Sequence, residues 1–245
     1  GEIRDSKNFG KYKIITAVSP TEYLIEFIRT GYTCVVRKSN LIKGEIKDKL
    51  LPVVCNVGYI GCGEYNSKHI SYYHWSSMIK RCYSVLSDGS NKAYLDKGVV
   101  VSEEWHDFQN FAKWFQDYIY ENKINYTKHR YNLDKDILGT GLLYSPSNCC
   151  VVPEVINTFH KDLYNAKGCK PNKNKSKPHT VSISGKWVKD FRTEEEAIYY
   201  YGYEKCKMFK KIMVNMNLNN NIVESFVRLF KLKFNVDFNV TVYEL

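Results

Sequence analysis

The sequence predicts an α+β chain made of several parts, because its hydrophobic pattern changes period along the chain. Toward the N-terminus, apolar residues form short β-branched and aromatic runs between turn-prone residues, which is typical of strands. Further on they recur every three or four residues, which is the spacing of an amphipathic helix. Hydrophobic residues make up 44% and aromatic residues 15% of the 245 residues. This composition is sufficient for ordinary cores and is not that of a disordered chain.

Residues 1–65 predict a β-rich N-terminal module. Three runs have the composition of short strands: Tyr12–Ile15, Tyr23–Ile28 and Cys34–Val36. Turn-prone dipeptides, Ser19-Pro20 and Thr30-Gly31, separate them. We expect a small barrel-like or curled sheet that ends at the glycine-bearing turn of residues 57–63.

Residues 66–165 predict a central helical segment followed by a strand–strand–helix core. Apolar residues have helical spacing in two stretches: Trp75, Met78, Ile79 and Cys82, then Phe108, Phe111, Ala112, Trp114 and Phe115. The stretch Gly98–Val101 between them has the composition of a strand. We expect the aromatic residues from Trp105 to Trp114 to pack in a core and not to stack on bases.

Residues 166–178 predict a basic linker and residues 179–245 a C-terminal module. The linker contains Lys167, Lys170, Lys173, Lys175 and Lys177. It is either a solvated connection or a segment that follows a nucleic-acid backbone. In the C-terminal module, Ser184-Gly185-Lys186 between two strand-like runs predicts a β-hairpin. Thr193 with Glu196 is a capping-box pattern, and Ile222–Phe234 predicts an amphipathic helix.

The charge balance indicates a polyanionic partner. Lys and Arg number 36 against 26 Asp and Glu, so the net charge is +10 and the pI about 9.0. Nucleic acid is the partner that such a balance favours, although charge alone does not distinguish DNA from RNA and also allows a membrane surface. No apolar run approaches a membrane span and the N-terminus has no signal-peptide core, so we expect a cytoplasmic protein without a membrane partner. A monomer is favoured, and the oligomeric state stays open.

Cysteine spacing argues against a zinc site. The chain has 8 cysteines and no C-x-x-C pair. We therefore expect reduced thiols that serve mainly as packing residues, including the adjacent Cys149 and Cys150.

The segment that suggests chemistry begins at Leu133–Leu138, which predicts a short strand with two carboxylates, Asp134 and Asp136. A second strand then leads through Pro153 into a helix that contains Asn157 and His160. An aspartate on the first strand and an amide on the helix could hold one divalent cation, and hard oxygen ligands suit Mg²⁺ or Mn²⁺. Such a cation would stabilise charge on a scissile phosphate.

In their order and spacing, these residues resemble the HNH, or ββα-metal, endonucleases of bacteriophages and their homing relatives. The likeness lies in Asp134, in Tyr144-Ser145-Pro146-x-Asn148-Cys149-Cys150-Val151-Val152-Pro153 and in Ile156-Asn157. It continues upstream in Trp75-x-x-Met78-x-x-Arg81-Cys82-Tyr83 and Phe108-Gln109-Asn110-Phe111-Ala112-x-Trp114. The chain is most similar to the branch with Asn in the third motif position. Weaker similarity covers residues 10–230, and the specific motifs lie within residues 70–160.

The resemblance implies hydrolysis of DNA phosphodiester bonds, by nicking or cutting, with one divalent metal ion bound by Asp134 and Asn157. It also implies that Asn148, nine residues before Asn157, braces the site, and that the core approaches the minor-groove side of double-stranded DNA. Lys80, Arg81, Arg130 and the linker lysines would contact flanking phosphates, while the C-terminal hairpin with Lys186 and its helix would supply specificity.

One position departs from the better-known pattern, which has His as general base directly after the first Asp. Lys135 stands there, and a lysine beside two carboxylates is expected to stay protonated. It could stabilise charge on the phosphate but could not accept a proton. The base is then Asp136, a metal-bound water, or one of His160, His129 and His106.

Two other functions remain open from sequence. The chain could be a nuclease-derived DNA-binding regulator or inhibitor that lost catalysis through Lys135. It could also act on RNA, because its 20 tyrosines would suit stacking on single strands.

Overall fold

The computed structural model describes residues 1–85, 89, 91–126, 129–139, 141–165, 169–171, 179–216 and 218–239, with only the backbone at 169–171. The chain divides into two compact units, Gly1–Gln116 and Asp117–Leu245. Both contain helices and strands, so the chain is α+β as predicted. In the predicted linker, Lys167, Lys173, Lys175 and Lys177 lie outside the described residues, as does the side chain of Lys170. The predicted module boundaries at residues 65 and 165 stay predictions.

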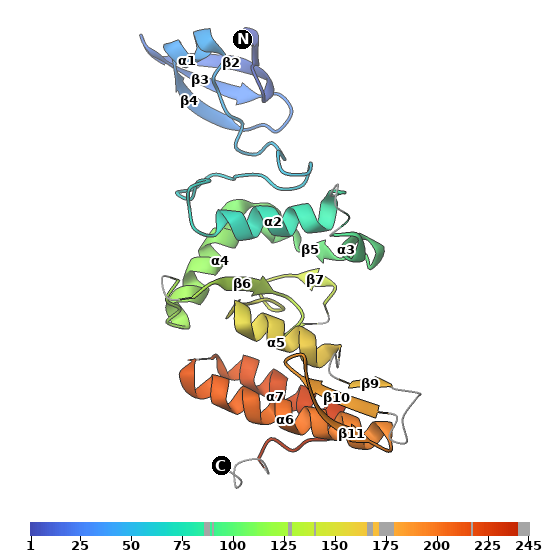
Figure 1. Ribbon diagram of the computed structural model, residues 1–245. Coiled ribbons are helices and arrows are strands. Elements are labelled where there is room, and N and C mark those ends of the chain that lie inside the picture. The colour runs from blue at the N-terminus through green and yellow to red at the C-terminus, as the bar shows by residue number, and fades with distance from the viewer. Residues whose placement is uncertain are drawn as a thin grey trace. The chain divides into compact units, whose positions relative to one another are not determined.

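The first unit begins with a four-stranded antiparallel sheet in the order β1-β2-β3-β4 (Figure 1). Its strands are β1 (Ile3–Ser6), β2 (Gly10–Ser19), β3 (Glu22–Phe27) and β4 (Thr33–Arg37), followed by helix α1 (Lys38–Lys43). The three predicted runs lie in β2, β3 and β4. Tyr12, Ile25 and Phe27 are buried together with Leu41 and Ile46 in a small core under the sheet. The predicted β-rich start of the chain therefore has its own hydrophobic core.

The rest of the first unit is mainly helical. Its elements are α2 (Tyr72–Tyr83), α3 (Lys92–Asp96), β5 (Val100–Val101), the 3-10 helix η1 (Glu103–His106) and α4 (Phe108–Glu121), which runs on into the second unit. Trp75 is fully buried, and its indole N–H donates to the carbonyl of Trp105 at 2.7 Å. Phe108 and Phe111 are also fully buried, so the aromatic residues pack in a core as expected.

The second unit combines short strands with helices whose apolar faces surround one core. After the end of α4, its elements are β6 (Tyr131–Asp134), β7 (Leu143–Tyr144), β8 (Cys150–Pro153), α5 (Glu154–Tyr164), β9 (Cys169–Pro171), β10 (His179–Ile183), β11 (Lys186–Phe191), α6 (Glu194–Asn215) and α7 (Asn220–Phe234). Phe159, Phe209, Phe226 and Phe230 are buried at the centre of this core. The core thus joins α5, α6 and α7.

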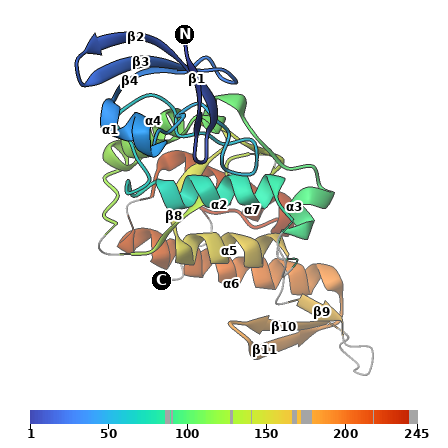
Figure 2. The same cartoon turned by 90° about the horizontal axis from the view of Figure 1, so that it is seen from above.

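The C-terminal part has the predicted hairpin. Strands β10 and β11 are antiparallel and β9 pairs with β10 on the other side (Figure 2). Ser184 and Gly185 form the two-residue turn with φ of 52° and 78°, which are the positive angles that tight hairpin turns require. The Thr193 hydroxyl accepts the N–H of Glu196 at 3.2 Å, so the predicted cap begins α6.

Within the described ranges, no helix combines the length and the apolar character needed to cross a membrane.

Candidate functional site

A strand pair and the helix that follows it form the framework of the candidate site. Strands β6 and β8 are antiparallel, with Asp134 opposite Cys150 and Leu133 opposite Val151. Helix α5 begins directly after β8 and packs against both strands. The end of β6 and the first turns of α5 therefore belong to one compact framework in the second unit.

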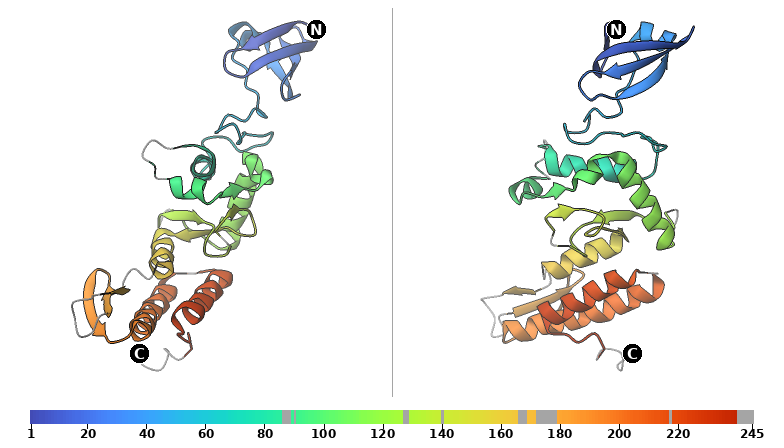
Figure 3. Two further views of the ribbon diagram at one scale, coloured as in Figure 1. Left: turned by 90° about the vertical axis from the view of Figure 1, so that its right-hand side faces the viewer. Right: turned by 180° about the vertical axis from the view of Figure 1, so that it is seen from behind.

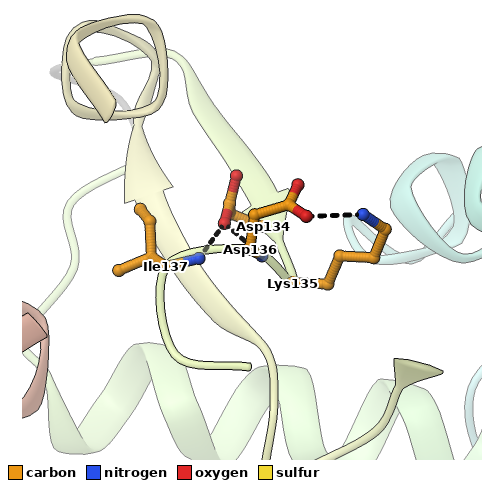
Figure 4. Close-up of polar contacts among 4 residues, drawn as sticks. All are labelled: Asp134, Lys135, Asp136 and Ile137. Atoms are coloured by element: carbon orange, nitrogen blue, oxygen red, sulfur yellow. Dashed lines mark hydrogen bonds and ion pairs between the residues drawn. The ribbon is translucent and has the colours of Figure 1, made fainter. Parts of the chain in front are cut away.

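Asp134 is the last residue of β6, and it ends that strand. Its side chain is buried at 5% exposure. The carboxylate oxygen Oδ1 accepts the backbone N–H groups of Asp136 and Ile137, both at 2.8 Å, while the second oxygen points away from them (Figure 4). The prediction of a strand from Leu133 to Leu138 was therefore wrong beyond Asp134, because this side chain replaces the strand ladder as the acceptor for the next amides.

Asn157 lies in α5 and is 8% exposed. Its carbonyl oxygen Oδ1 is buried and accepts no hydrogen bond from the described part of the chain. A buried acceptor without a partner costs about 1–3 kcal/mol, and most such groups in proteins are satisfied. A bound cation would satisfy this oxygen, so the Asn157 amide is of the kind that could serve as one ligand of the hard metal ion that the sequence predicts.

His160 lies on α5 one turn after Asn157 and is 7% exposed. Burial lowers the pKa of His160, and the negative charges of Asp134 and Asp136 partly oppose this effect. The ring is therefore neutral at pH 7, and it is close enough to both carboxylates to respond to their charge. The His160 and Phe226 rings pack in a T-shaped arrangement, with the ring centroids 5.6 Å apart.

Lys135 is buried in the turn after β6, although lysine is rarely buried unless it is paired. Its Nζ lies 2.8 Å from Asp136 Oδ1 (Figure 4) and 5.5 Å from the centroid of the Tyr144 ring. An ion pair and the face of an aromatic ring are both partners for an ammonium cation. Lys135 thus adds a fixed positive charge next to the carboxylates.

Asn148 lies against the loop that follows β6, and Asp136 belongs to that loop. A Cβ atom on Gly139 would meet the Cβ of Asn148 at 2.9 Å, so Asn148 is in close contact with this loop. Gly141 has φ of 80°, and a Cβ there would meet the Asp136 carboxylate. The predicted bracing role of Asn148 stays a prediction, and its contact with Gly139 is compatible with that role.

The other candidate bases belong to other elements than α5. His129 is exposed and precedes β6, at the end opposite to Asp134. His106 belongs to η1 in the first unit. His160 is the histidine whose pKa the charge of Asp134 raises.

The predicted DNA-contacting residues are distributed over both units. Lys80 and Arg81 lie in the last turn of α2 in the first unit. Arg130 is exposed just before β6, and Lys186 is exposed at the start of β11. Each has the exposure or the helix-end position that a phosphate contact needs, and their role stays a prediction.

Two cations near the site were not selected from sequence. Lys161 and Lys233 both lower the pKa of His160, so both lie within electrostatic reach of it. Lys233 Nζ also donates to the carbonyl of Tyr164 and lies 4.9 Å from that ring. Lys161 could have been found as the neighbour of His160, whereas Lys233 belongs to α7 and only the tertiary structure places it there.

Cys149 and Cys150 are buried, as the sequence predicts for packing residues. Burial raises the pKa of Cys149 to about 12 and the pKa of Cys150 as well, so both thiols are protonated at pH 7. Across the described residues, no group of three or more His, Cys, Asp or Glu side chains could hold a metal ion. The proposed pair of Asp134 and Asn157 is not a group of this type, because it has two members and one of them is an amide.

Comparison with protein-family models, with curated proteins and with solved structures found no match to this chain.

Proposed function

We propose that this chain is a DNA endonuclease of the HNH, or ββα-metal, type that hydrolyses phosphodiester bonds with one divalent cation, Mg²⁺ or Mn²⁺. The observation that supports this most is the Asn157 carbonyl oxygen, a buried acceptor without a hydrogen bond on the helix that packs against Asp134. The antiparallel pair of β6 and β8 followed by α5 agrees with the strand–strand–helix order that the resemblance implies.

In this proposal Asp134 and Asn157 hold the ion through their side-chain oxygens. The ion, when bound, would stabilise the negative charge that develops on the phosphate and the leaving oxygen. Asp134 is already fixed for this role, because two backbone amides orient its carboxylate.

His160 is the base that fits best. It is neutral at pH 7, so its free ring nitrogen can take a proton from the attacking water. Lys135 would add positive charge at the phosphate, because its ammonium group is held in place by Asp136 and the Tyr144 ring. Asn148 would keep the loop that follows β6 in position.

Binding to double-stranded DNA would come mainly from phosphate contacts. The net charge of +10 gives a general attraction, to which Lys80, Arg81, Arg130, Lys161 and Lys186 would contribute directly. The hairpin of β10 and β11 presents an exposed Trp187 beside Lys186, and together with α6 it would add contacts outside the cleavage site.

The test is nicking of supercoiled plasmid by the full chain with Mg²⁺, Mn²⁺ or a chelator. We expect nicking that depends on the metal and is at least 100-fold slower in Asp134→Ala, in line with the typical loss of about 10²–10³ for a group that stabilises charge. Asn165→Ala is the matched control. Asn165 is an exposed residue directly after α5 in the same unit, its amide bonded to the Lys161 carbonyl, and its variant should retain full activity.

A second candidate is a catalytically impaired DNA-binding regulator or inhibitor. The observation in its favour is Lys135, which occupies the position of the expected base and is engaged with Asp136 as a cation. If the wild-type chain binds DNA but nicks it with neither metal, this candidate replaces the enzyme. Competition by RNA in the same binding assay tests whether the substrate is RNA.

A further inference from the structure

A cavity lies in the second unit and is lined by other residues than those of the proposed cleavage site. Its volume is about 320 Å³, within the range of about 300–1,000 Å³ that is usual for small-ligand sites. Segments distant in the sequence form its walls: the end of α4 and the residues after it, the start of β6, part of β8, and the connection between α6 and α7. None of Asp134, Lys135, Asn157 and His160 lines it.

Side-chain amides form the polar part of this cavity. They are Asn122, Asn125, Asn215 and Asn219. The Asn219 amide donates to Asn122 Oδ1 at 2.6 Å, and Asn122 Nδ2 donates to the Tyr118 carbonyl at 2.8 Å. Asn215 Nδ2 donates to the Lys211 carbonyl at 3.1 Å. These bonds fix the orientation of three amides, and each amide has two N–H donors and two acceptor lone pairs, so capacity remains for a ligand.

The apolar part of the cavity combines two tyrosines with aliphatic side chains, and its charge is positive. Tyr118 and Tyr131 line it together with Pro153 and aliphatic residues such as Ile222. Lys123 and His129, both exposed, supply the titratable nitrogen groups. Among the described lining residues none has a carboxylate. A metal ion or an amine would therefore find no counter-charge, and a sugar would lack the strong acceptors that suit its hydroxyl groups.

We infer that this cavity binds one nucleotide, with the base against the tyrosine rings and the amides and the phosphate at Lys123 and His129. Aromatic rings stack on a base, and amide groups match the donors and acceptors at its edge. The nucleotide could be free in solution, or it could be a base turned out of a DNA strand. Both have the same chemistry, and the proposal is independent of whether the chain cleaves DNA.

The first experiment is calorimetric titration of the full chain with dAMP, dGMP, dCMP and TMP in the presence of a chelator. Deoxyribose 5-phosphate, which lacks the base, is the ligand control. We expect at least one nucleotide to bind ten times or more tightly than this control. Asn215→Leu should weaken that binding about tenfold, because an amide that contacts the base is lost.

Asn165→Leu is the protein control, because it removes the same kind of amide from the same unit. Asn165 Nδ2 donates to the carbonyl four residues earlier at 2.9 Å, as Asn215 does, but Asn165 does not line the cavity. It should leave nucleotide binding unchanged. Equal losses in the two variants would overturn the proposal.

The second experiment uses a DNA duplex that contains 2-aminopurine, whose fluorescence rises when it leaves the base stack. A rise on binding that Asn215→Leu abolishes and Asn165→Leu retains would identify a base turned out of DNA as the occupant. Nucleotide binding without such a rise would identify a free nucleotide. If no nucleotide binds and the duplex signal does not depend on Asn215, the inference is wrong.

Discussion

At the scale of single residues, the buried amide of Asn157 and the buried carboxylate of Asp134 differ in how they are satisfied. Asp134 Oδ1 has two backbone donors, whereas Asn157 Oδ1 has none within the described residues. A protein that retains such an oxygen in its interior loses stability to it, unless a ligand supplies the missing contact. The role of the Asn157 oxygen can therefore be tested by measuring stability, without an activity assay.

We predict that Asn157→Leu leaves the metal-free protein as stable as the wild type or stabilises it by up to about 1 kcal/mol. Leucine has a similar volume and removes a buried acceptor that has no partner. The increase in melting temperature that Mg²⁺ or Mn²⁺ gives the wild type should be absent. Thermal unfolding with and without metal measures both effects. A loss of more than about 2 kcal/mol in the metal-free variant would mean that the amide has a structural role.

The burial of His74 makes the stability of the protein depend on pH. Burial, with a smaller effect of Arg81, lowers the pKa of His74 from 6.5 to about 4. Between these values the unfolded chain binds a proton that the native chain does not, so stability is complete above pH 6.5 and falls as the pH approaches 4. The loss is about 3 kcal/mol over this window. Urea unfolding at several pH values measures it.

The matched variant is His74→Phe, which keeps a ring next to Phe115, whose centroid is 5.1 Å from that of His74. It should remove most of the change in stability between pH 6.5 and 4. An unchanged pH profile in this variant would assign the effect to other groups.

At the scale of elements, α6 and α7 lie side by side in the second unit (Figure 3). They approach closely at Gly202. A Cβ atom at this position would overlap the Cβ of Phe234, which is buried. Glycine in the middle of a helix is otherwise unfavourable, so its presence here is explained by the close approach of the two helices.

We predict that Gly202→Ala destabilises the second unit by about 1–3 kcal/mol, because overpacking a core has this cost. Helix propensity alone predicts the opposite sign, a gain of about 1 kcal/mol. Urea unfolding followed by far-UV circular dichroism distinguishes the two. A more stable variant would show that the helices can separate without cost.

Element types and ends were largely predictable from sequence, because they depend on local chemistry. The hairpin turn at Ser184-Gly185 and the cap at Thr193 lie where turn and capping residues indicated. The end of β6 was not predictable, because the Leu133–Leu138 pattern continues as an apolar strand. Only the hydrogen bonds of the Asp134 side chain show why the strand stops there.

At the scale of the whole molecule, the excess of Lys and Arg is the property most directly linked to a polyanion. Lys161 and Arg130 are exposed, and Lys161 acts electrostatically on His160. Lys7 is exposed as well, but it is paired with Glu45 at 3.2 Å in the N-terminal sheet module. Replacing Lys161, Arg130 or Lys7 by alanine lowers the net charge by the same amount. A difference in DNA affinity between these variants therefore reports a local phosphate contact and not the general attraction.

We predict that the affinity for duplex DNA falls steeply between about 50 and 200 mM salt, as counterion release requires. Lys161→Ala and Arg130→Ala should each reduce the slope of log K against log salt by about 1. Lys7→Ala should leave the slope unchanged. Fluorescence anisotropy with a labelled duplex measures these slopes. Equal slopes in all three variants would contradict a phosphate contact at Lys161 and Arg130.

The sequence by itself determined the α+β class, the positions of most helices and strands, and the residue types of the candidate site. These follow from hydrophobic period, turn residues and caps, which act between neighbours in the chain. Only the tertiary structure decided that the Asn157 oxygen stays without a hydrogen bond, that Lys233 lies near His160 and that four amides line one cavity. Burial and hydrogen-bond satisfaction depend on groups far apart in sequence, which no local pattern specifies.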